Sequence, residues 1–374
     1  MNSVRFLSHK STVKIWRLML SLFLLFLGVR SSMAESFTNL WAYAGAAYNQ
    51  KNWEQTIDYC NKAIALETNN PLVYLARASA FEYTKQFEKA EADFNKAVVL
   101  ATNNIPLSLA YLGRGHFYQQ VTNYERAVDD SSKAIQINPA FQMAYVQRAI
   151  AYNFQHRYDL SIIDCNMATL LNPDDVEACF YKGNAFYGKQ EYAKAIEAYG
   201  KAIEINTNYS WAYQARAFAY FSKEDYKQAI NNFDKFIQLQ PTNAEAFSCR
   251  GLSKSRNGDF RGGIEDCRKG VQLNTNSEVA LNNLAWLLAT APKSNQRDGQ
   301  KAVVYARRAC ELNSWKNAYF LGTLAAANAE IGNFDEAVKW ERKCIIIGLP
   351  EKEMDQAHRE LNLFENKKPY HADK

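Results

Sequence analysis

The stretch 174–207, DDVEACFYKGNAFYGKQEYAKAIEAYGKAIEINT, decides the fold of this 374-residue chain, because two copies of its pattern follow it directly. They are residues 208–241, NYSWAYQARAFAYFSKEDYKQAINNFDKFIQLQP, and 242–275, TNAEAFSCRGLSKSRNGDFRGGIEDCRKGVQLNT. The three segments align without gaps at a spacing of 34 residues. A fixed period of this length is typical of proteins in which each repeat buries its apolar faces against its neighbours.

The same register extends in both directions and gives nine repeats. They start at Phe37, Pro71, Ser108, Gln142, Val176, Ser210, Ala244, Glu278 and Ala318. Two insertions interrupt the register, one of three residues at 105–107 and one in the turn of the eighth repeat around 291–300. Position numbers below count from the first residue of each repeat.

Each repeat contains two segments with the periodicity of an amphipathic helix. Apolar or small residues stand at positions 4, 8 and 11 and again at 20, 24 and 27, as in i, i+3, i+4 spacing. Small residues recur at positions 8 and 20, and an aromatic residue occupies position 17 in eight of the nine repeats. We expect a helix hairpin in which the small residues let the two backbones approach closely.

This scheme resembles the tetratricopeptide repeat family, whose unit is a 34-residue helix–turn–helix. The resemblance implies an all-α, right-handed superhelical solenoid of about nine hairpins over 35–351. A C-terminal capping helix and a loose polar tail are expected in 352–374. The apolar residues of that helix share one face: Met354, Ala357, Leu361 and Phe364.

The net charge of +5 comes entirely from the first 34 residues. They hold five of the 44 Lys and Arg residues and no acidic residue, which leaves 39 basic and 39 acidic residues in the remainder. Twelve uncharged residues lie between Arg17 and Arg30, and small residues follow at Ser32 and Ala34. This pattern predicts a signal peptide over 1–34 and export to the periplasm or outside the cell. An uncleaved membrane anchor is the alternative, because Arg30 lies close to the expected cut.

A ladder of basic residues occupies position 7 in six successive repeats: Arg77, Arg114, Arg148, Lys182, Arg216 and Arg250. Such a ladder is compatible with binding of nucleic acid or of an acidic peptide. Aspartates stand sixteen residues later in four of these repeats: Asp93, Asp130, Asp164 and Asp266. This covariation favours ion pairs between the two helices of each hairpin.

Positions 2, 5, 9 and 12 form the helix face that, by the resemblance, lines a concave surface. Only Glu82, Glu177 and Glu245 are charged among its 36 residues, so nucleic acid is a poor candidate partner. The candidate groove residues lie in the fifth and sixth repeats: Phe180, Asn184, Tyr187, Trp211, Gln214, Phe218 and Phe221. Rigid aromatic rings interleaved with amides suit docking of an extended peptide or an amphipathic helix from a partner protein. Packing on the neighbouring repeat is the alternative interpretation.

No phosphate loop, nucleophile elbow or zinc-ligand spacing is present, so we expect no enzyme activity, catalytic residue, metal or cofactor. Most of the seven cysteines stand at packed positions, although Cys165 and Cys179 could form a disulfide. Three glycines in the second helix of repeat 7 predict a flexible joint over 260–272. The sequence as a whole predicts an exported protein-binding scaffold. The alternatives are an accessory subunit of a cell-envelope enzyme or export complex, and a carbohydrate-binding or enzymatic solenoid.

Overall fold

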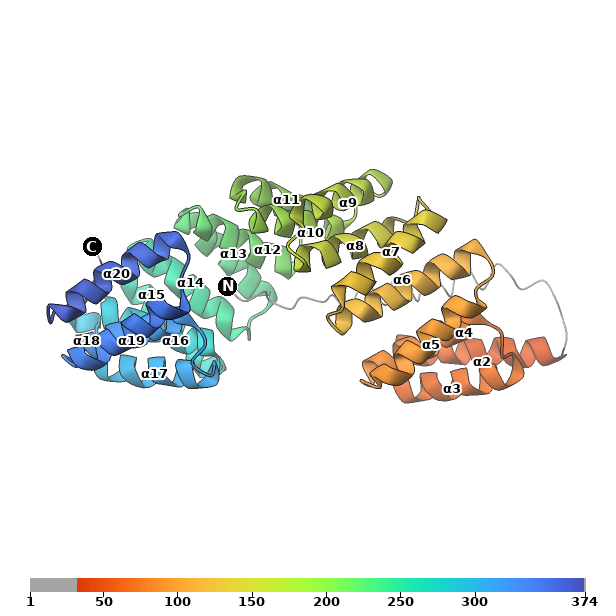
Figure 1. Cartoon of the computed structure of the whole chain (residues 1–374), viewed down its shortest axis with the longest axis horizontal. Helices are drawn as coiled ribbons and strands as arrows, with labels where there is room; N and C mark the ends of the chain where they lie inside the picture. The colour runs from red at the N-terminus through yellow and green to blue at the C-terminus, as the bar shows by residue number, and fades with distance from the viewer. Residues whose placement is uncertain (1–31, 373–374) are drawn as a thin grey trace. The chain divides into compact units, whose positions relative to one another are not determined.

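The computed structural model describes residues 32–372, and within that range the chain is all-α. Two compact units divide at the turn of the fifth repeat, so that the N-terminal unit ends at Glu191 and the C-terminal unit begins at Tyr192. Figure 1 shows the helices of each unit as successive antiparallel pairs. The predicted signal peptide lies outside the described residues except for 32–34, which form the start of the first described helix.

From Ser32 onward, the N-terminal unit contains four hairpins and one further helix. Their bounds are α2 Ser32–Asn49 with α3 Trp53–Leu66, α4 Pro71–Tyr83 with α5 Phe87–Leu100, α6 Asn104–Gln120 with α7 Tyr124–Ile137, α8 Gln142–Phe154 with α9 Tyr158–Leu171, and α10 Val176–Gly188. The three-residue insertion at 105–107 lies in the first turn of α6, where it lengthens the helix and leaves the following register intact.

The C-terminal unit begins with one helix, continues with four hairpins and ends with a cap. The bounds are α11 Tyr192–Ile205, α12 Ser210–Ser222 with α13 Tyr226–Leu239, α14 Ala244–Arg256 with α15 Phe260–Leu273, α16 Glu278–Thr290 with α17 Gly299–Leu312, α18 Ala318–Glu330 with α19 Phe334–Ile347, and α20 Glu351–Glu365. The inserted turn of the eighth repeat contains the short 3₁₀ helix η1, Ser294–Gln296.

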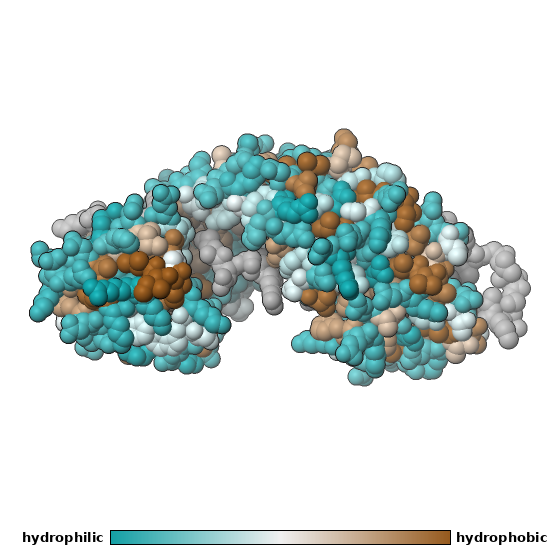
Figure 2. Space-filling model, viewed as in Figure 1, coloured by the Kyte–Doolittle hydropathy of each residue, from teal (hydrophilic) through white to brown (hydrophobic). Residues whose placement is uncertain are grey.

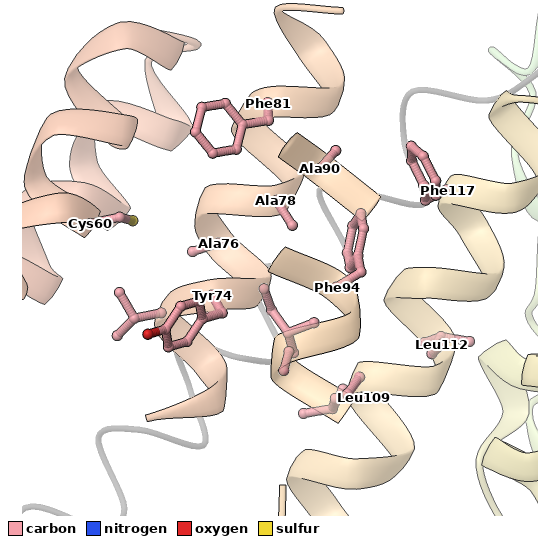
Figure 3. Packing of buried hydrophobic residues seen from close by; sticks show 14 of the residues in the cluster. Cys60, Tyr74, Ala76, Ala78, Phe81, Ala90, Phe94, Leu109, Leu112 and Phe117 are labelled. Carbon is pink, nitrogen blue, oxygen red and sulfur yellow. The ribbon is translucent and has the colours of Figure 1, made fainter. Parts of the chain in front are cut away.

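The small residues at positions 8 and 20 lie where the two helices of a hairpin touch. In the second repeat these are Ala78 on α4 and Ala90 on α5, and both are fully buried (Figure 3). Phe94 of α5 lies against Phe117 of the next repeat, with ring centroids 5.5 Å apart. Small residues therefore close each hairpin, and larger apolar residues fill the space between hairpins.

Each regular turn contains one residue in the left-handed backbone region, at position 15. Six of these residues are not glycine: Lys51, Lys85, Thr122, His156, Gln190 and Glu224, with φ between 59° and 63°. Gly258 and Gly332 occupy the same position with φ of 91° and 78°. The turn geometry therefore persists even where the residue type does not favour it.

The glycines of repeat 7 show the close backbone approach that we expected of the small residues at positions 8 and 20. A Cβ added to Gly263 on α15 would lie 2.6 Å from the carbonyl oxygen of Gly251 on α14. A Cβ added to Gly270 would lie 2.6 Å from the carbonyl oxygen of Ala244. These glycines allow a closer helix approach than alanine permits, and α15 is one continuous helix. The flexibility expected for this segment stays a prediction.

The C-terminal tail is packed, which corrects the expectation of a loose segment. After the cap α20, whose Phe364 is fully buried, the ring of Tyr370 lies 5.8 Å from that of Trp286 on α16. His371 Nε2 lies 2.7 Å from Glu330 Oε2, and the backbone N–H of Ala372 donates to the carbonyl of Thr290. The tail therefore contacts the first helices of the last two repeats.

Candidate functional site

The predicted groove residues of the C-terminal unit share one face of α12. Trp211, Gln214, Phe218 and Phe221 are spaced by three, four and three residues, so they form a single stripe along the helix. Gln214 is only 5% exposed, whereas the three aromatic side chains are half-buried. The structure therefore brings these four side chains to one surface, which we call the α12 stripe.

Each aromatic residue of the α12 stripe packs on an aromatic residue of α13. Ring centroids lie 5.7 Å apart for Trp211 and Phe236, and 5.4 Å apart for Phe218 and Phe233. Phe221 makes a third pair with Tyr226 at 5.3 Å. Each of these three aromatic side chains therefore packs within its hairpin and is still partly exposed.

The other three candidate residues lie on α10 in the N-terminal unit. Phe180 is 2% exposed and stands edge-on to Tyr181 at 5.2 Å between ring centroids. Asn184 and Tyr187 are half-buried on the same face of the helix. Within the N-terminal unit, Asn184 and Tyr187 of α10 are therefore partly exposed, whereas Phe180 is buried.

The ion pairs expected from the position-7 ladder are confirmed in four repeats. In each, the arginine Nε and Nη2 donate to the two carboxylate oxygens of the aspartate sixteen residues later. The pairs are Arg77 with Asp93 (2.7 and 2.8 Å), Arg114 with Asp130 (2.7 and 2.9 Å), Arg148 with Asp164 (2.8 and 2.8 Å) and Arg250 with Asp266 (2.7 and 2.7 Å). These bidentate pairs join the two helices of one hairpin.

The same arginines also bond to the preceding repeat, a contact that sequence reasoning missed. Nη1 donates to a polar side chain at position 25 of that repeat: Arg77 to Asn61 (2.7 Å), Arg114 to Asn95 (2.8 Å), Arg148 to Ser132 (3.0 Å) and Arg250 to Asp234 (2.7 Å). The acceptors vary between amide, hydroxyl and carboxylate, so position 25 carries no obvious signature. Each arginine therefore links two helices of its own repeat and one of the repeat before.

Two ladder members lack the aspartate, as the sequence indicates. Arg216 Nε donates to Asn232 Oδ1 at 2.8 Å. Lys182, on α10, is half-buried. The other four basic residues are engaged with carboxylates and are poor candidates for holding a polyanion.

Two of the three acidic residues on the predicted ligand face (positions 2, 5, 9 and 12), Glu82 and Glu177, are largely withdrawn from solvent, whereas Glu245 is exposed. Burial raises the pKa of Glu82 to about 8, and its Oε1 lies 3.7 Å from His116 Nε2. Burial, and then Glu278, raises the pKa of Glu245. Glu177 is buried as well. Because Glu82 is mainly protonated at neutral pH, the face carries even less charge than its composition suggests.

The cysteines are separate thiols, so the disulfide between Cys165 and Cys179 is not formed in the structure. Burial raises the pKa of Cys165, which disfavours the reactive thiolate. Within residues 32–372, no group of three or more His, Cys, Asp or Glu side chains is arranged to hold a metal ion. No helix in that range combines the length and apolar character needed to cross a membrane.

Family models match four stretches of the chain. A model described as TPR repeat matches residues 183–223 and 218–258, and one described as tetratricopeptide repeat matches 72–104 and 109–141. No curated protein sequence matches significantly. The matched stretches all lie within residues 72–258 and cover parts of both units.

Solved structures show the same kind of fold at low sequence identity. A tetratricopeptide repeat protein from Parabacteroides merdae is 18% identical, with a TM-score of 0.52 over 67% of this chain and 98% of that one. The APC/C hetero-tetramer Cut9–Hcn1 contains a chain that is 11% identical, with a TM-score of 0.50 over 95% of this chain and 92% of that one. A repeat-containing protein from Cytophaga hutchinsonii is 20% identical, with a TM-score of 0.48 over 65% and 98%. At these identities the first two likenesses establish the fold alone.

Proposed function

Because this chain belongs to the tetratricopeptide repeat family, whose members bind protein or peptide partners, we propose that it is an exported scaffold that binds a segment of a partner protein on the first helices of its repeats. Scaffolds of this family are typically non-enzymatic, and the proposed role requires no chemistry. The partner segment is an extended peptide or an amphipathic helix.

The α12 stripe is the observation that carries this proposal. Trp211, Phe218 and Phe221 each pack on a ring of α13, yet each keeps part of its surface exposed. An aromatic side chain held in this way offers apolar area to a ligand at low cost in conformational entropy. Gln214 lies on the same helix face but is only 5% exposed. We therefore assign the stripe as the centre of the partner-binding surface.

The charge distribution supports a partner chosen by shape and apolar contact. Four of the six ladder cations are bonded to aspartates of their own repeat. Among the three acidic residues of that face, Glu177 is buried and Glu82 is mainly protonated at pH 7, whereas Glu245 is exposed. In Figure 2 the visible face of each unit is mainly hydrophilic, with separate hydrophobic patches. Apolar area is thus concentrated at particular places rather than spread over the surface.

Export is the second part of the proposal, and it is supported by the basic and apolar pattern of residues 1–34. Cleavage after Ala34 would remove the first three residues of α2. N-terminal sequencing of the protein from its native cell tests this directly. A mature chain that begins at Glu35 supports export with cleavage, whereas one that begins at Met1 or Asn2 contradicts cleavage.

The binding role is tested by affinity capture from cell-envelope extract with residues 35–374 as bait. The test variant is Trp211→Ala/Phe221→Ala. The matched control is Ile163→Ala/Leu170→Ala, which removes apolar side chains that are 56% and 74% exposed on the second helix α9. Circular dichroism and denaturation confirm that each bait is folded.

A partner that is captured by the wild type and the control but lost from the stripe variant supports the assignment. If the stripe variant retains every partner, the stripe is not the binding surface. If the protein binds polysaccharide and no protein, the scaffold role itself is wrong.

A further inference from the structure

We propose that Arg216 forms a second binding site, which accepts a carboxylate of an acidic segment in a partner protein. In four other repeats the arginine at position 7 is neutralised by an aspartate at position 23. In the sixth repeat that position holds Asn232. The positive charge of the Arg216 guanidinium is therefore not balanced by an aspartate, as it is for the arginines of those four repeats.

The hydrogen bonds of Asn232 leave the terminal nitrogens of Arg216 available. Asn232 Oδ1 accepts from Arg216 Nε at 2.8 Å, and its Nδ2 donates to the carbonyl of Gln228 at 2.8 Å. An amide nitrogen cannot accept a hydrogen bond, so Nη2 of Arg216 has no counterpart of the second aspartate oxygen. Among the residues that the structure describes, Asn232 is the one hydrogen-bond acceptor of this side chain.

The position-25 acceptor is missing as well. The preceding repeat has Gly200 there, on α11, where the other repeats have Asn61, Asn95, Ser132 or Asp234. A Cβ added to Gly200 would lie 3.6 Å from Arg216 Nη1, with no other atom within 4 Å. The space that a side chain fills in the other repeats is therefore open beside Nη1.

The aromatic support of the guanidinium is retained. The Arg216 guanidinium carbon lies 5.8 Å from the ring centroid of Tyr213, as Arg148 lies 5.8 Å from Tyr145 in the fourth repeat. The side chain is half-buried between α11, α12 and α13. A partly desolvated, pre-positioned guanidinium binds a carboxylate more strongly than a mobile surface arginine does.

A carboxylate is the ligand chemistry that the other repeats indicate. In each of the four complete sites, the chain itself supplies a carboxylate to the Nε and Nη2 donors of the arginine. In the sixth repeat, an Asp or Glu side chain of a partner would give Arg216 the carboxylate that the chain itself does not supply there. The nearby Lys201 is paired with Glu204 at 2.8 Å.

This site is distinct from the α12 stripe and goes beyond the proposed function. Arg216 and Gln214 are two residues apart on α12, which places them about 200° apart around the helix axis. An acidic ligand at Arg216 therefore approaches from the side opposite the stripe. Loss of one site leaves the other intact, so the two proposals fail independently.

The test is a titration of the full chain with a fluorescently labelled hexaglutamate peptide, followed by anisotropy at low salt, with hexaglutamine as the neutral probe. The key variant is Asn232→Asp, which supplies the aspartate found in the other repeats. The control is Asn231→Asp, which adds the same charge at an exposed neighbouring residue of α13. Both substitutions conserve side-chain size, and circular dichroism checks that the fold is retained.

We expect wild type to bind hexaglutamate in a salt-sensitive manner and hexaglutamine not at all. Asn232→Asp should weaken binding about tenfold, because the internal carboxylate occupies the guanidinium, and Asn231→Asp should weaken it less than about twofold. Gly200→Asp should resemble Asn232→Asp, since Asp234 bonds Arg250 from the equivalent position. Absence of hexaglutamate binding, or an equal effect of the two α13 variants, overturns the site. A phosphoserine peptide that competes tenfold better overturns the assignment to a carboxylate.

Discussion

Arg148 and Asp164 form a bidentate ion pair that joins α8 to α9, with Nε to Oδ2 at 2.8 Å and Nη2 to Oδ1 at 2.8 Å. The same arginine reaches Ser132 in the preceding repeat. Burial raises the pKa of Asp164, and the Arg148 guanidinium opposes that effect. A residue at a single position therefore holds a hairpin together and attaches it to its neighbour.

Removing the charge of Asp164 should destabilise the protein. In Asp164→Asn the Nε hydrogen bond persists, as it does between Arg216 and Asn232, but a half-buried guanidinium loses its counter-ion. We expect a loss of about 1–3 kcal/mol in the free energy of unfolding, measured with urea. Asp159→Asn is the control, because Asp159 is 77% exposed in its pair with Lys189 and should matter by less than about 0.5 kcal/mol. Equal losses in the two variants would contradict the role of the buried pair.

Replacing Thr122 with glycine should stabilise the protein. Thr122 has a φ of 61° in the turn between α6 and α7, where a β-branched residue is strained and glycine is not. Thr122→Gly should raise the free energy of unfolding by about 0.5–1 kcal/mol.

The reverse substitution provides the check on that prediction. Gly332 has a φ of 78° at the same position of the ninth repeat, and no atom lies within 4 Å of where its Cβ would be. Gly332→Thr should therefore destabilise the protein through backbone strain alone, without any steric clash of the new side chain. A stabilising Gly332→Thr, or a destabilising Thr122→Gly, would show that turn strain is not the controlling factor.

Gly263→Ala should destabilise the seventh repeat by about 1–3 kcal/mol, even though alanine is the better helix former. The added methyl would lie 2.6 Å from the carbonyl oxygen of Gly251 and would force α14 and α15 apart. Gly200→Ala is the control, since its methyl meets only Arg216 Nη1, at 3.6 Å. That change should instead stabilise by about 0.5–1 kcal/mol. Urea denaturation compares the two, and a neutral or stabilising Gly263→Ala would exclude close packing as the reason for the glycine.

The packing of the capping helix α20 on α19 should become less stable as pH rises. Burial, and then Glu360, raises the pKa of Glu341 on α19 to about 8. Burial raises the pKa of Glu360 on α20 to about 7, opposed by Gln356, Arg256 and Arg359. Both carboxyls are thus protonated in the fold at pH values where the unfolded chain, with a pKa near 4.5, has released the protons.

The sign of the pH effect follows from those protons. Their contribution to stability is complete below about pH 4.5 and is lost as pH rises through 7 to 8, at up to about 1.4 kcal/mol per pH unit for each group. Glu360→Gln should flatten the pH dependence of urea unfolding between pH 5 and 8. Identical pH profiles for this variant and wild type would contradict the buried carboxyl pair.

Much of the fold could be predicted because the same residue pattern recurs in several repeats. Arg114 alone would be ambiguous, but an aspartate sixteen residues after four of the ladder arginines predicts a pair, and all four pairs are present. The third hydrogen bond of each arginine could not be predicted in this way, because its acceptor changes from Asn95 to Ser132 to Asp234. The left-handed residue of each turn was missed for the same reason, since lysine, threonine and histidine all occupy that position.

The candidate site was predicted less completely than the fold. Spacing places Trp211, Gln214, Phe218 and Phe221 on one helix face, and the structure agrees, but periodicity does not tell how deeply each side chain is buried. That depends on what lies beneath it, such as Phe233 and Phe236 of α13. The packed tail was missed because a short polar segment has no periodicity from which docking can be predicted.

The sequence by itself determined the period, the paired helices, the small residues at their contact and the ion pairs that repeat with them. These depend on local spacing and on residues that recur every 34 positions. Only the tertiary structure decided that the backbones at Gly251 and Gly263 come closer than alanine would permit, that Tyr370 packs on Trp286, and that the guanidinium of Arg216 faces the open space at Gly200. Each of these depends on how close two separate helices or segments come. That distance is set by the packing of all their side chains together, and no single stretch of sequence specifies it.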